Sequence, residues 1–429
     1  MLKKIRVDQV RLGMHLHSLE GAWMDHPFWK TKFVIRDQDQ LKKLQDSVIA
    51  EVWIDPEKGL DLVEPVAELS APVRAAPAAP VKPVPTTPPA TLPAAPAARA
   101  VRPPVVGAPL PPPSKSFAEE MRTAANVCNK GKAQVERMFN EARLGKALDT
   151  ESFQPLVQDI SDSVIRNPGA LVSLARLKTQ DDYSYMHSVA VCALMVALGR
   201  ELGFDEAECR SAGTAGLLHD VGKALMPLDI LNKPGKLTDE EFDVMRSHPA
   251  RGHELLVEAR GADAATMDVC LHHHERMDGT GYPHKLTVDG ITRFARMGAI
   301  CDVYDAITSN RPYKSGWDPA DSIGKMASWK GHFDPTIFAT FVKSVGIYPT
   351  GSLVKLHSDR LAVVLEQNTH ALTAPIVRVF FSLKSSMPVS LQRLDLSTGT
   401  SDRIVGRELP ERWNFTFLEE LWAGEAAKR

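Results

Sequence analysis

The sequence has no long apolar run, no excess of charge of either sign and few cysteines. Its longest uncharged, largely apolar run, residues 188–199, has twelve residues, whereas a helix that crosses a membrane needs about 20. No apolar stretch follows the basic N-terminus, so we expect no secretory signal. Lys and Arg number 51 and Asp and Glu 53, so no global positive field favours a nucleic acid polymer or a membrane surface as a partner.

The five cysteines are scattered along the chain and never form a CxxC pair. This spacing argues against a disulfide framework and against a thiolate zinc site. Reduced, packed thiols are the simpler interpretation. Together with the absence of a signal and of a membrane span, they predict a cytoplasmic protein.

A change in composition divides the 429 residues, which are enough for two or three domains. Residues 65–113 hold 16 of the 31 prolines and 13 alanines, with no aromatic residue, so this stretch cannot build a hydrophobic core. Proline at this density favours polyproline II segments. The stretch is therefore either a semi-rigid spacer or a disordered loop.

The pattern of apolar residues predicts a mainly α protein with a small sheet near each end. Near the N-terminus, β-like runs at 3–7 and 51–54 flank a helical stretch at 38–47. The aromatic residues at 23–29 are either the core of this N-terminal module or a partner-binding face, and the core is favoured. Helical spacing then persists to about residue 345. The predicted parts are a small α+β regulatory or docking domain at 1–64, a Pro/Ala-rich linker at 65–114, a helical connector at 115–164, an all-α catalytic domain at 165–345 and a short β-rich C-terminal extension at 346–429.

Histidines and aspartates gather in the helical part. Seven of the fourteen histidines lie between residues 187 and 274. His187 shares a helical face with aliphatic residues, and the His219-Asp220 pair directly follows an apolar helical run. A buried polar pair needs partners, and a metal ion supplies them. Further imidazoles and carboxylates that helices would bring to the same place are His248, the run 272–275, Asp302 and Asp305.

This donor set predicts hydrolytic phosphate chemistry. Mixed imidazole and carboxylate ligands suit iron, manganese, nickel or zinc better than magnesium or calcium. One carboxylate can bridge two cations, and two metals about 3.5–4 Å apart can activate a water and hold both oxygens of an in-line phosphoryl displacement.

These residues resemble the HD-GYP domain, a branch of the HD metal-dependent phosphohydrolases. The resemblance covers about residues 165–345 and includes the literal Asp278-Gly279-Thr280-Gly281-Tyr282-Pro283. The first 60 or so residues are similar to a small domain of unknown function that often precedes HD-GYP domains. The resemblance implies an HD-type helical fold and hydrolysis of cyclic di-GMP, a bacterial second messenger, to linear pGpG and, in some members, on to GMP.

The resemblance also implies a role for each matching residue. Asp220 would bridge two metals, the first held by His187, His219 and Asp302 and the second by His248, His273 and His274. Lys223 would contact the scissile phosphate and, with Asp220, makes up the predicted catalytic pair. The predicted substrate-binding residues are Lys223, Tyr282, Asp305, Arg311 and Lys314, and Asp305 has the alternative of supporting a metal ligand from behind.

One position departs from the pattern of some family members. They carry a glutamate four residues before the first histidine that helps to hold a third metal, whereas Tyr183 stands there in this chain. A phenol is a poor ligand at neutral pH. We therefore expect two divalent transition-metal ions, with iron or manganese favoured over nickel or zinc, and pGpG as the product, with GMP as the alternative.

Two alternatives stay open at this point. The first is a cyclic di-GMP sensor or docking module with little turnover, which would bind proteins such as diguanylate cyclases through its Gly281-Tyr282-Pro283 surface. The second is a hydrolase of another cyclic dinucleotide, such as cyclic GMP-AMP. A homodimer formed through the helices between residues 117 and 165 is compatible with either.

Overall fold

The computed structural model describes most of the chain outside the proline-rich stretch. The described residues are 2–19, 33–35, 38–45, 51–60, 116–177, 183–233, 235–309, 316–368, 370–399, 402–413, 415 and 417–427. Four features of the sequence lie outside them, namely the linker at 65–113, the aromatic stretch at 23–29, Arg311 and Lys314. The chain divides into two compact units, residues 1–109 and 110–429, which are described separately.

The N-terminal unit is a small antiparallel sheet with one helix. The strands lie in the order β1 (Lys3–Arg6), β4 (Glu51–Ile54), β2 (His15–Leu19) and β3 (Phe33–Val34). Val52 and Ile54 alternate with more exposed neighbours along β4 and point into the core. Helix α1 (Gln38–Gln45) adds Leu44 to the same core. The prediction of a small α+β domain is confirmed.

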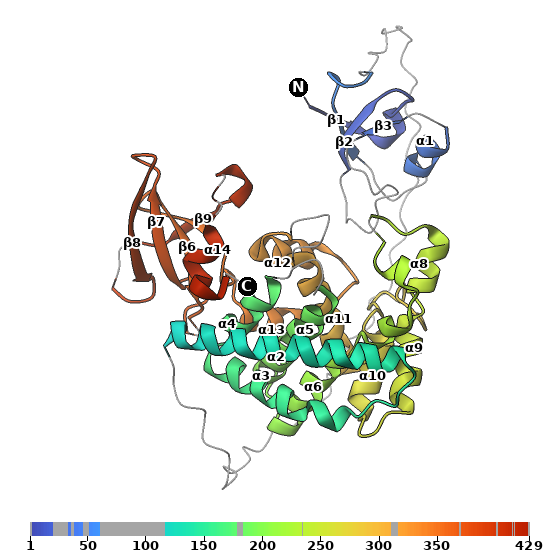
Figure 1. Cartoon of the computed structure of the whole chain (residues 1–429). Helices are drawn as coiled ribbons and strands as arrows, with labels where there is room; N and C mark the ends of the chain where they lie inside the picture. Colours follow the sequence, from blue (N-terminus) through green and yellow to red (C-terminus); the bar gives the residue numbers. More distant parts are fainter. Residues whose placement is uncertain are drawn as a thin grey trace, which may run out of the picture. The chain divides into compact units, whose positions relative to one another are not determined.

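Helix α5 (Tyr183–Glu201) lies at the centre of the second unit (Figure 1). Residues 186–199 of this helix are all buried, because its sides are covered by neighbouring helices and no polar face is needed. Those neighbours are α2 (Phe117–Arg143), α3 (Gln154–Arg166), α4 (Pro168–Arg176), α6 (Glu206–Leu218), α11 (Arg293–Thr308) and α13 (Pro335–Val345). The other helices are α7 (Leu228–Leu231), α8 (Asp239–Met245), α9 (His248–Val257), α10 (Ala264–His272), α12 (Pro319–Ser328) and α14 (Leu418–Ala423).

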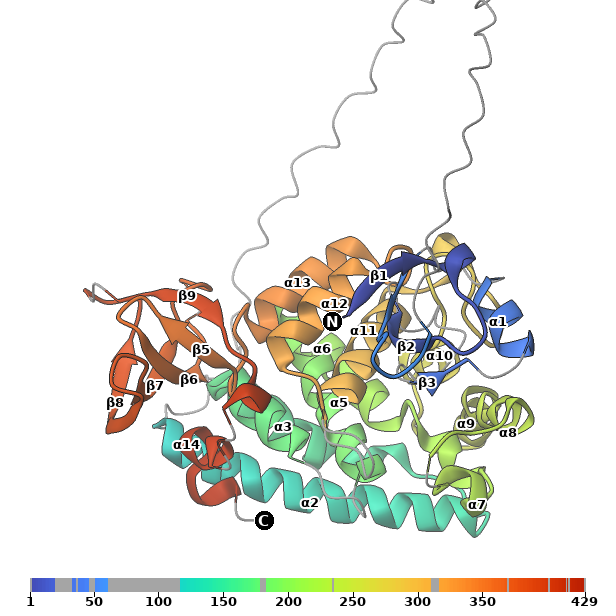
Figure 2. The same cartoon turned by 90° about the horizontal axis from the view of Figure 1, so that it is seen from above.

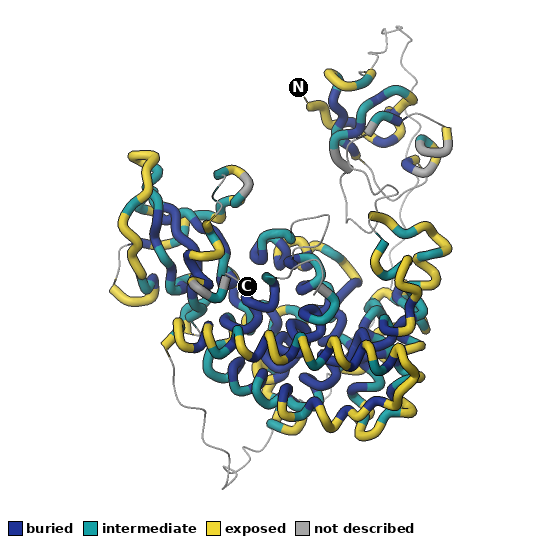
Figure 3. The backbone as a smooth tube through the Cα atoms, viewed as in Figure 1, coloured by how far each residue is buried: buried dark blue, intermediate teal, exposed yellow. Residues whose placement is uncertain are grey.

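Helix α2 is one continuous, amphipathic helix along the outside of this unit. It begins at a capping box in which Ser116 and Glu119 satisfy each other's backbone N–H groups. Its buried positions recur every three or four residues, while its other face is exposed (Figure 3). The buried residues of α2 and α3 belong to the same hydrophobic core as those of α5, so the stretch predicted as a connector packs with the rest of the helices.

Two glycines allow the backbone to approach closely where the polar residues of the unit gather. A Cβ on Gly216 of α6 would lie 2.9 Å from the carbonyl oxygen of Val191 in α5. A Cβ on Gly222 would collide with the carbonyl oxygen of His248. Gly222 lies in the 3-10 helix η4 (Val221–Leu225) that follows α6. The missing side chains thus let α6 lie close to α5 and let η4 lie close to the start of α9.

The C-terminal residues form a five-stranded antiparallel sheet beside one end of the helices (Figure 2). The strand order is β8 (Met387–Asp395), β7 (Ile376–Ser382), β6 (Arg360–Glu366), β5 (Leu353–Leu356) and β9 (Ile404–Arg407). Leu361 and Val363 of β6 join the helical core, whereas Ala362 and Val364 join a separate core on the opposite face. The predicted β-rich extension is confirmed. Strands β8 and β9 lack a run of apolar residues because most of their side chains are exposed or half-buried.

The five cysteines are buried free thiols. Among the described helices, none combines the length with the apolar character that a bilayer crossing requires.

A buried ion pair between α2 and α3 generates a stability prediction. Glu120 is 1% exposed, and its carboxylate accepts hydrogen bonds from Arg166 Nε at 2.5 Å and from Ser163 Oγ at 2.7 Å. Glu120→Ala leaves the guanidinium buried without its counter-charge, so we expect a loss of about 3–5 kcal/mol in the free energy of unfolding. Chemical denaturation measures this. Glu136→Ala on the exposed face of α2 is the control, and a loss for Glu120→Ala no larger than for that control would contradict the prediction.

Candidate metal centre

Seven of the predicted site residues converge inside the helical unit from five separate segments. His187 comes from α5, His219 and Asp220 directly follow α6, His248 begins α9, His273 and His274 directly follow α10, and Asp302 comes from α11. They form two groups, each with its ligand atoms within 4.8 Å of one another: His187, His219 and Asp302 in one, and Asp220, His248, His273 and His274 in the other. This is the division that the resemblance implied.

Four of these imidazoles are oriented by hydrogen bonds from the nitrogen that faces away from the cluster. His219 Nδ1 lies 2.8 Å from the carbonyl oxygen of Gly216, and His248 Nδ1 lies 2.7 Å from that of Met245. His273 Nδ1 lies 3.0 Å from the carbonyl oxygen of Val269, and His187 Nδ1 lies 2.6 Å from Asp305 Oδ2. Because these acceptors bind the hydrogen on Nδ1, each ring in its neutral form directs the lone pair of Nε2 at the cluster.

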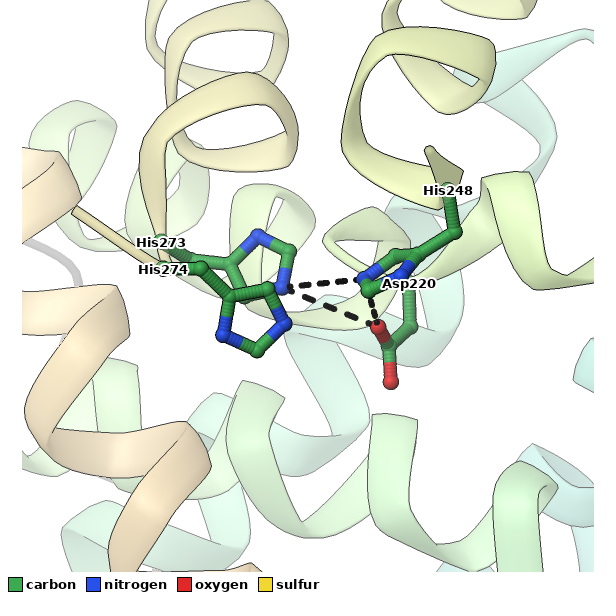
Figure 4. Close-up of side chains that lie close together, drawn as sticks. All are labelled: Asp220, His248, His273 and His274. Atoms are coloured by element: carbon green, nitrogen blue, oxygen red, sulfur yellow. Dashed lines mark hydrogen bonds and ion pairs between the residues drawn. The ribbon is translucent and has the colours of Figure 1, made fainter. Parts of the chain in front are cut away.

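Asp220 stands between the two groups. Its Oδ2 lies 3.3 Å from His219 Nε2 and 3.5 Å from His187 Nε2. Its Oδ1 lies 3.1 Å from His248 Nε2 and 3.7 Å from His273 Nε2. Figure 4 shows this second side, with the rings of His248 and His273 directed at the same carboxylate oxygen. One carboxylate therefore faces both sets of imidazoles, as a bridging ligand would.

The charges of the cluster are strongly coupled because almost all of it is buried. Burial raises the pKa of Asp220, but the nearby Lys223 and His219 outweigh it and hold this pKa well below its usual range. Burial likewise raises the pKa of Asp302, and hydrogen bonds from His187 and His219 more than reverse it. Both carboxylates are therefore anionic at neutral pH.

The imidazoles respond in opposite directions. Burial lowers the pKa of His219, but the charges and hydrogen bonds of Asp220 and Asp302 outweigh it and raise this pKa to about 10. Burial and the neighbouring His219 lower the pKa of His273 to about 3. Without a metal, the two carboxylates thus hold one proton on His219 while His273 stays neutral.

These residues fit a metal site on grounds internal to the structure. Four Nε2 atoms face two carboxylates, and the buried Asp220 Oδ1 accepts no hydrogen bond of good geometry from the described residues. An anionic oxygen held this way is costly unless a cation accepts it. Nitrogen and oxygen donors together suit a transition metal.

The predicted substrate-binding residues differ in their exposure and in their contacts with the cluster. Lys223 forms an ion pair with Asp220 and keeps 23% of its side chain exposed. Tyr282 stacks on His274, with ring centroids 4.6 Å apart. Asp305, in contrast, is 1% exposed and accepts hydrogen bonds from His187 Nδ1 and from Ser309 Oγ. It thus contacts a candidate ligand, and its burial argues against the predicted contact with substrate.

Glu275 is a residue whose role the sequence did not reveal. It is 2% exposed, and its two carboxylate oxygens accept hydrogen bonds from the backbone N–H groups of His284, at 2.7 Å, and Leu286, at 2.9 Å. These bonds tie the segment that follows Tyr282 to the end of α10. The only signal available was the position of Glu275 directly after His273 and His274.

Comparisons with known proteins agree with this geometry. An HD domain family model matches residues 163–337, and a model for a domain of unknown function matches residues 2–153. The chain is 52% identical to the cyclic di-GMP phosphodiesterase PA4108 of Pseudomonas aeruginosa over 428 residues, which cover 99% of this chain and 97% of that protein. The chain belongs to the HD-GYP family. The resemblance drawn from the motifs is confirmed.

More distant relatives match less than half of the chain. The cyclic di-GMP phosphodiesterase response regulator RpfG of Xanthomonas campestris is 36% identical over 205 residues, or 46% of this chain and 53% of that protein. The 3′3′-cGAMP-specific phosphodiesterase 2 of Vibrio cholerae is 36% identical over 203 residues, or 47% of this chain and 37% of that protein. Relatives of this HD-GYP chain are thus named for two different cyclic dinucleotides.

The raised pKa of His219 predicts that metal binding releases a proton. At pH 7 the metal-free imidazole, with its pKa of about 10, holds a proton that a metal must displace, so affinity falls as pH falls. We expect about one proton released per chain when Mn²⁺ is added to chelator-treated protein in weak buffer, and less above pH 10. Indicator-dye titration measures this. Equal release at both pH values would contradict it.

The hydrogen bond from His187 to Asp305 predicts a loss of metal affinity on Asp305→Asn. The neutral amide cannot support the basicity of the ring as the carboxylate does, so affinity should fall by about 10- to 100-fold. Competition with a chromogenic chelator measures the affinity. Asp289→Asn, an exposed change of the same kind, is the matched control, and equal affinities in the two variants would refute the assigned contact.

Proposed function

We propose that this chain is a metal-dependent phosphodiesterase that hydrolyses cyclic di-GMP to pGpG. The observation that carries the proposal is the convergence of four imidazole Nε2 atoms on Asp220 and Asp302. The identity to PA4108, which extends over nearly the full length of both chains, supports the choice of substrate.

The proposed centre holds two divalent transition-metal ions, with iron or manganese favoured. His187, His219 and Asp302 would bind one, and His248, His273 and His274 would bind the other. Asp220 would bridge them, because its two oxygens face different groups. When bound, such a pair of cations supplies a water nucleophile at neutral pH and stabilises charge on the phosphate. Tyr183, the first residue of α5, supports two ions over three.

The chain's own residues prepare the site for an anionic substrate. Lys223 lies against Asp220 and is partly exposed, so its ammonium group is placed to meet a phosphate oxygen that approaches the centre. The depressed pKa values of Asp220 and Asp302 keep both carboxylates ionised, so no proton has to leave them before a cation binds. Asp305 holds the His187 ring at a fixed angle through its hydrogen bond.

The remaining assignments concern substrate and partners. Tyr282 would shape the pocket from its stacked position on His274, and Arg311 and Lys314 would bind ligand phosphates. Docking of diguanylate cyclases on residues 281–283, homodimer formation and the domain boundaries drawn from composition stay predictions.

The test is hydrolysis of cyclic di-GMP by protein purified without oxygen, with its metal content measured. We expect about two metals per chain and pGpG as the product. Asp220→Ala should lose metal and activity together. Lys223→Ala should keep its metal and lose about 100- to 1000-fold in kcat, whereas Lys146→Ala, an exposed lysine at the end of α2, should match the wild type.

Each other outcome points to a different function. Metal retained without turnover of any cyclic dinucleotide would overturn the enzyme proposal and favour a sensor or docking module. Turnover of cyclic GMP-AMP in preference to cyclic di-GMP would overturn the substrate alone, a result that the Vibrio cholerae relative makes worth measuring.

A further inference from the structure

Arg246 lies at the rim of the metal centre without a role in any assignment above. It follows the last residue of α8 and precedes His248 by two positions. Its guanidinium carbon lies 4.8 Å from the centroid of the Tyr282 ring. That ring stacks in turn on His274, with 26° between the planes. Arg246 is thus two stacking layers away from a candidate metal ligand.

The guanidinium of Arg246 lies near the Tyr282 ring and remains accessible. Its side chain is 37% exposed, and its ion pair with Asp243 is 3.6 Å long with a carboxylate that is 76% exposed. Such a pair contributes little because water screens it. Stacking over an aromatic ring orients the plane of a guanidinium and leaves its N–H groups directed sideways. The charge is therefore positioned and available to an anionic ligand.

We propose that Arg246 binds the phosphate of a cyclic dinucleotide that is not being cleaved. The proposal rests on the function proposed above. A cyclic dinucleotide carries two phosphodiester groups on opposite sides of one small ring, so when one is at the metals the other must lie at the rim of the site. A planar fork that donates two parallel hydrogen bonds matches a phosphodiester. The stack on Tyr282 and His274 places that fork within a short distance of the centre.

This assignment also gives Tyr282 a second use. Its ring separates the guanidinium from His274, which keeps a positive charge from approaching a candidate metal ligand directly. The loop that bears Tyr282 is tied down by Glu275 through two backbone hydrogen bonds. The position of Arg246 is therefore determined by the same loop that borders the centre.

The experiment compares Arg246→Ala, Arg246→Lys and wild type on two substrates. Cyclic di-GMP has a second phosphate, whereas bis(p-nitrophenyl) phosphate has only the one that is cleaved. We expect Arg246→Ala to raise KM for cyclic di-GMP by about 10- to 100-fold, the effect of losing a charged hydrogen bond. Arg246→Lys should recover part of this. Hydrolysis of the single-phosphate substrate should stay within about twofold of wild type in both variants, because the centre itself is unchanged.

Controls separate this proposal from the one on which it rests. Arg210→Ala removes the same charge from the exposed face of α6 and should leave both substrates unaffected. Cyclic GMP-AMP, used as a competing ligand, should lose affinity for Arg246→Ala to the same degree, since it shares the ring phosphates. A loss confined to cyclic di-GMP would indicate a contact with guanine and overturn the phosphate assignment.

Two further outcomes are decisive. An unchanged KM for cyclic di-GMP in Arg246→Ala, with an active wild type, would overturn the role of Arg246 alone. Equal losses on both substrates would show that Arg246 acts on the centre through Tyr282 and not on the second phosphate. A wild type that cleaves bis(p-nitrophenyl) phosphate but no cyclic dinucleotide would overturn both proposals.

Discussion

The carboxylate of Asp220 is the interaction on which the rest of the structure depends. It is 2% exposed and lies among imidazoles from α5, α6, α9 and α10. An ionised carboxylate in the interior is stable only if neighbouring groups compensate its charge. The packing of the helices therefore serves two ends at once. It buries a large aliphatic core, and it brings together the donors without which this one anion would not stay in the interior.

The need to compensate this buried charge explains several structural features whose purpose is not evident from the sequence alone. Gly222 has no side chain because η4 must lie against the first turn of α9, so that His248 reaches Asp220. His219, His248 and His273 donate their outer N–H groups to backbone carbonyls near the ends of helices. These three rings are thus oriented by the backbone, whereas His187 is oriented by a further buried polar residue, Asp305.

The charged groups at the rim of the centre differ from those in its interior in their exposure to solvent. Inside, the charged groups are almost fully buried, so the interactions between them are strong. At the rim, Lys223 and Arg246 keep part of their side chains exposed and pair with carboxylates that lie on the chain itself. Positive groups held in this way can exchange an internal partner for a phosphate of the ligand. The loop at Tyr282 lies between the two regions and is fastened to the inner one by Glu275.

The sequence by itself determined the architecture and the donor set. Apolar spacing predicted the helices, because a half-buried helix must repeat its apolar residues every three or four positions, and the order of the histidines and aspartates identified the family. Which residues would share a metal could be inferred only from the resemblance to the family, since this depends on which segments meet in space. The tertiary structure decided the rest. It placed Asp305 behind His187, one of the two roles expected for it, because residue 305 lies on the buried face of α11. It also brought Arg246 to Tyr282 across 36 residues of chain, a contact that depends on packing between α8 and a loop and leaves no periodic trace in the sequence.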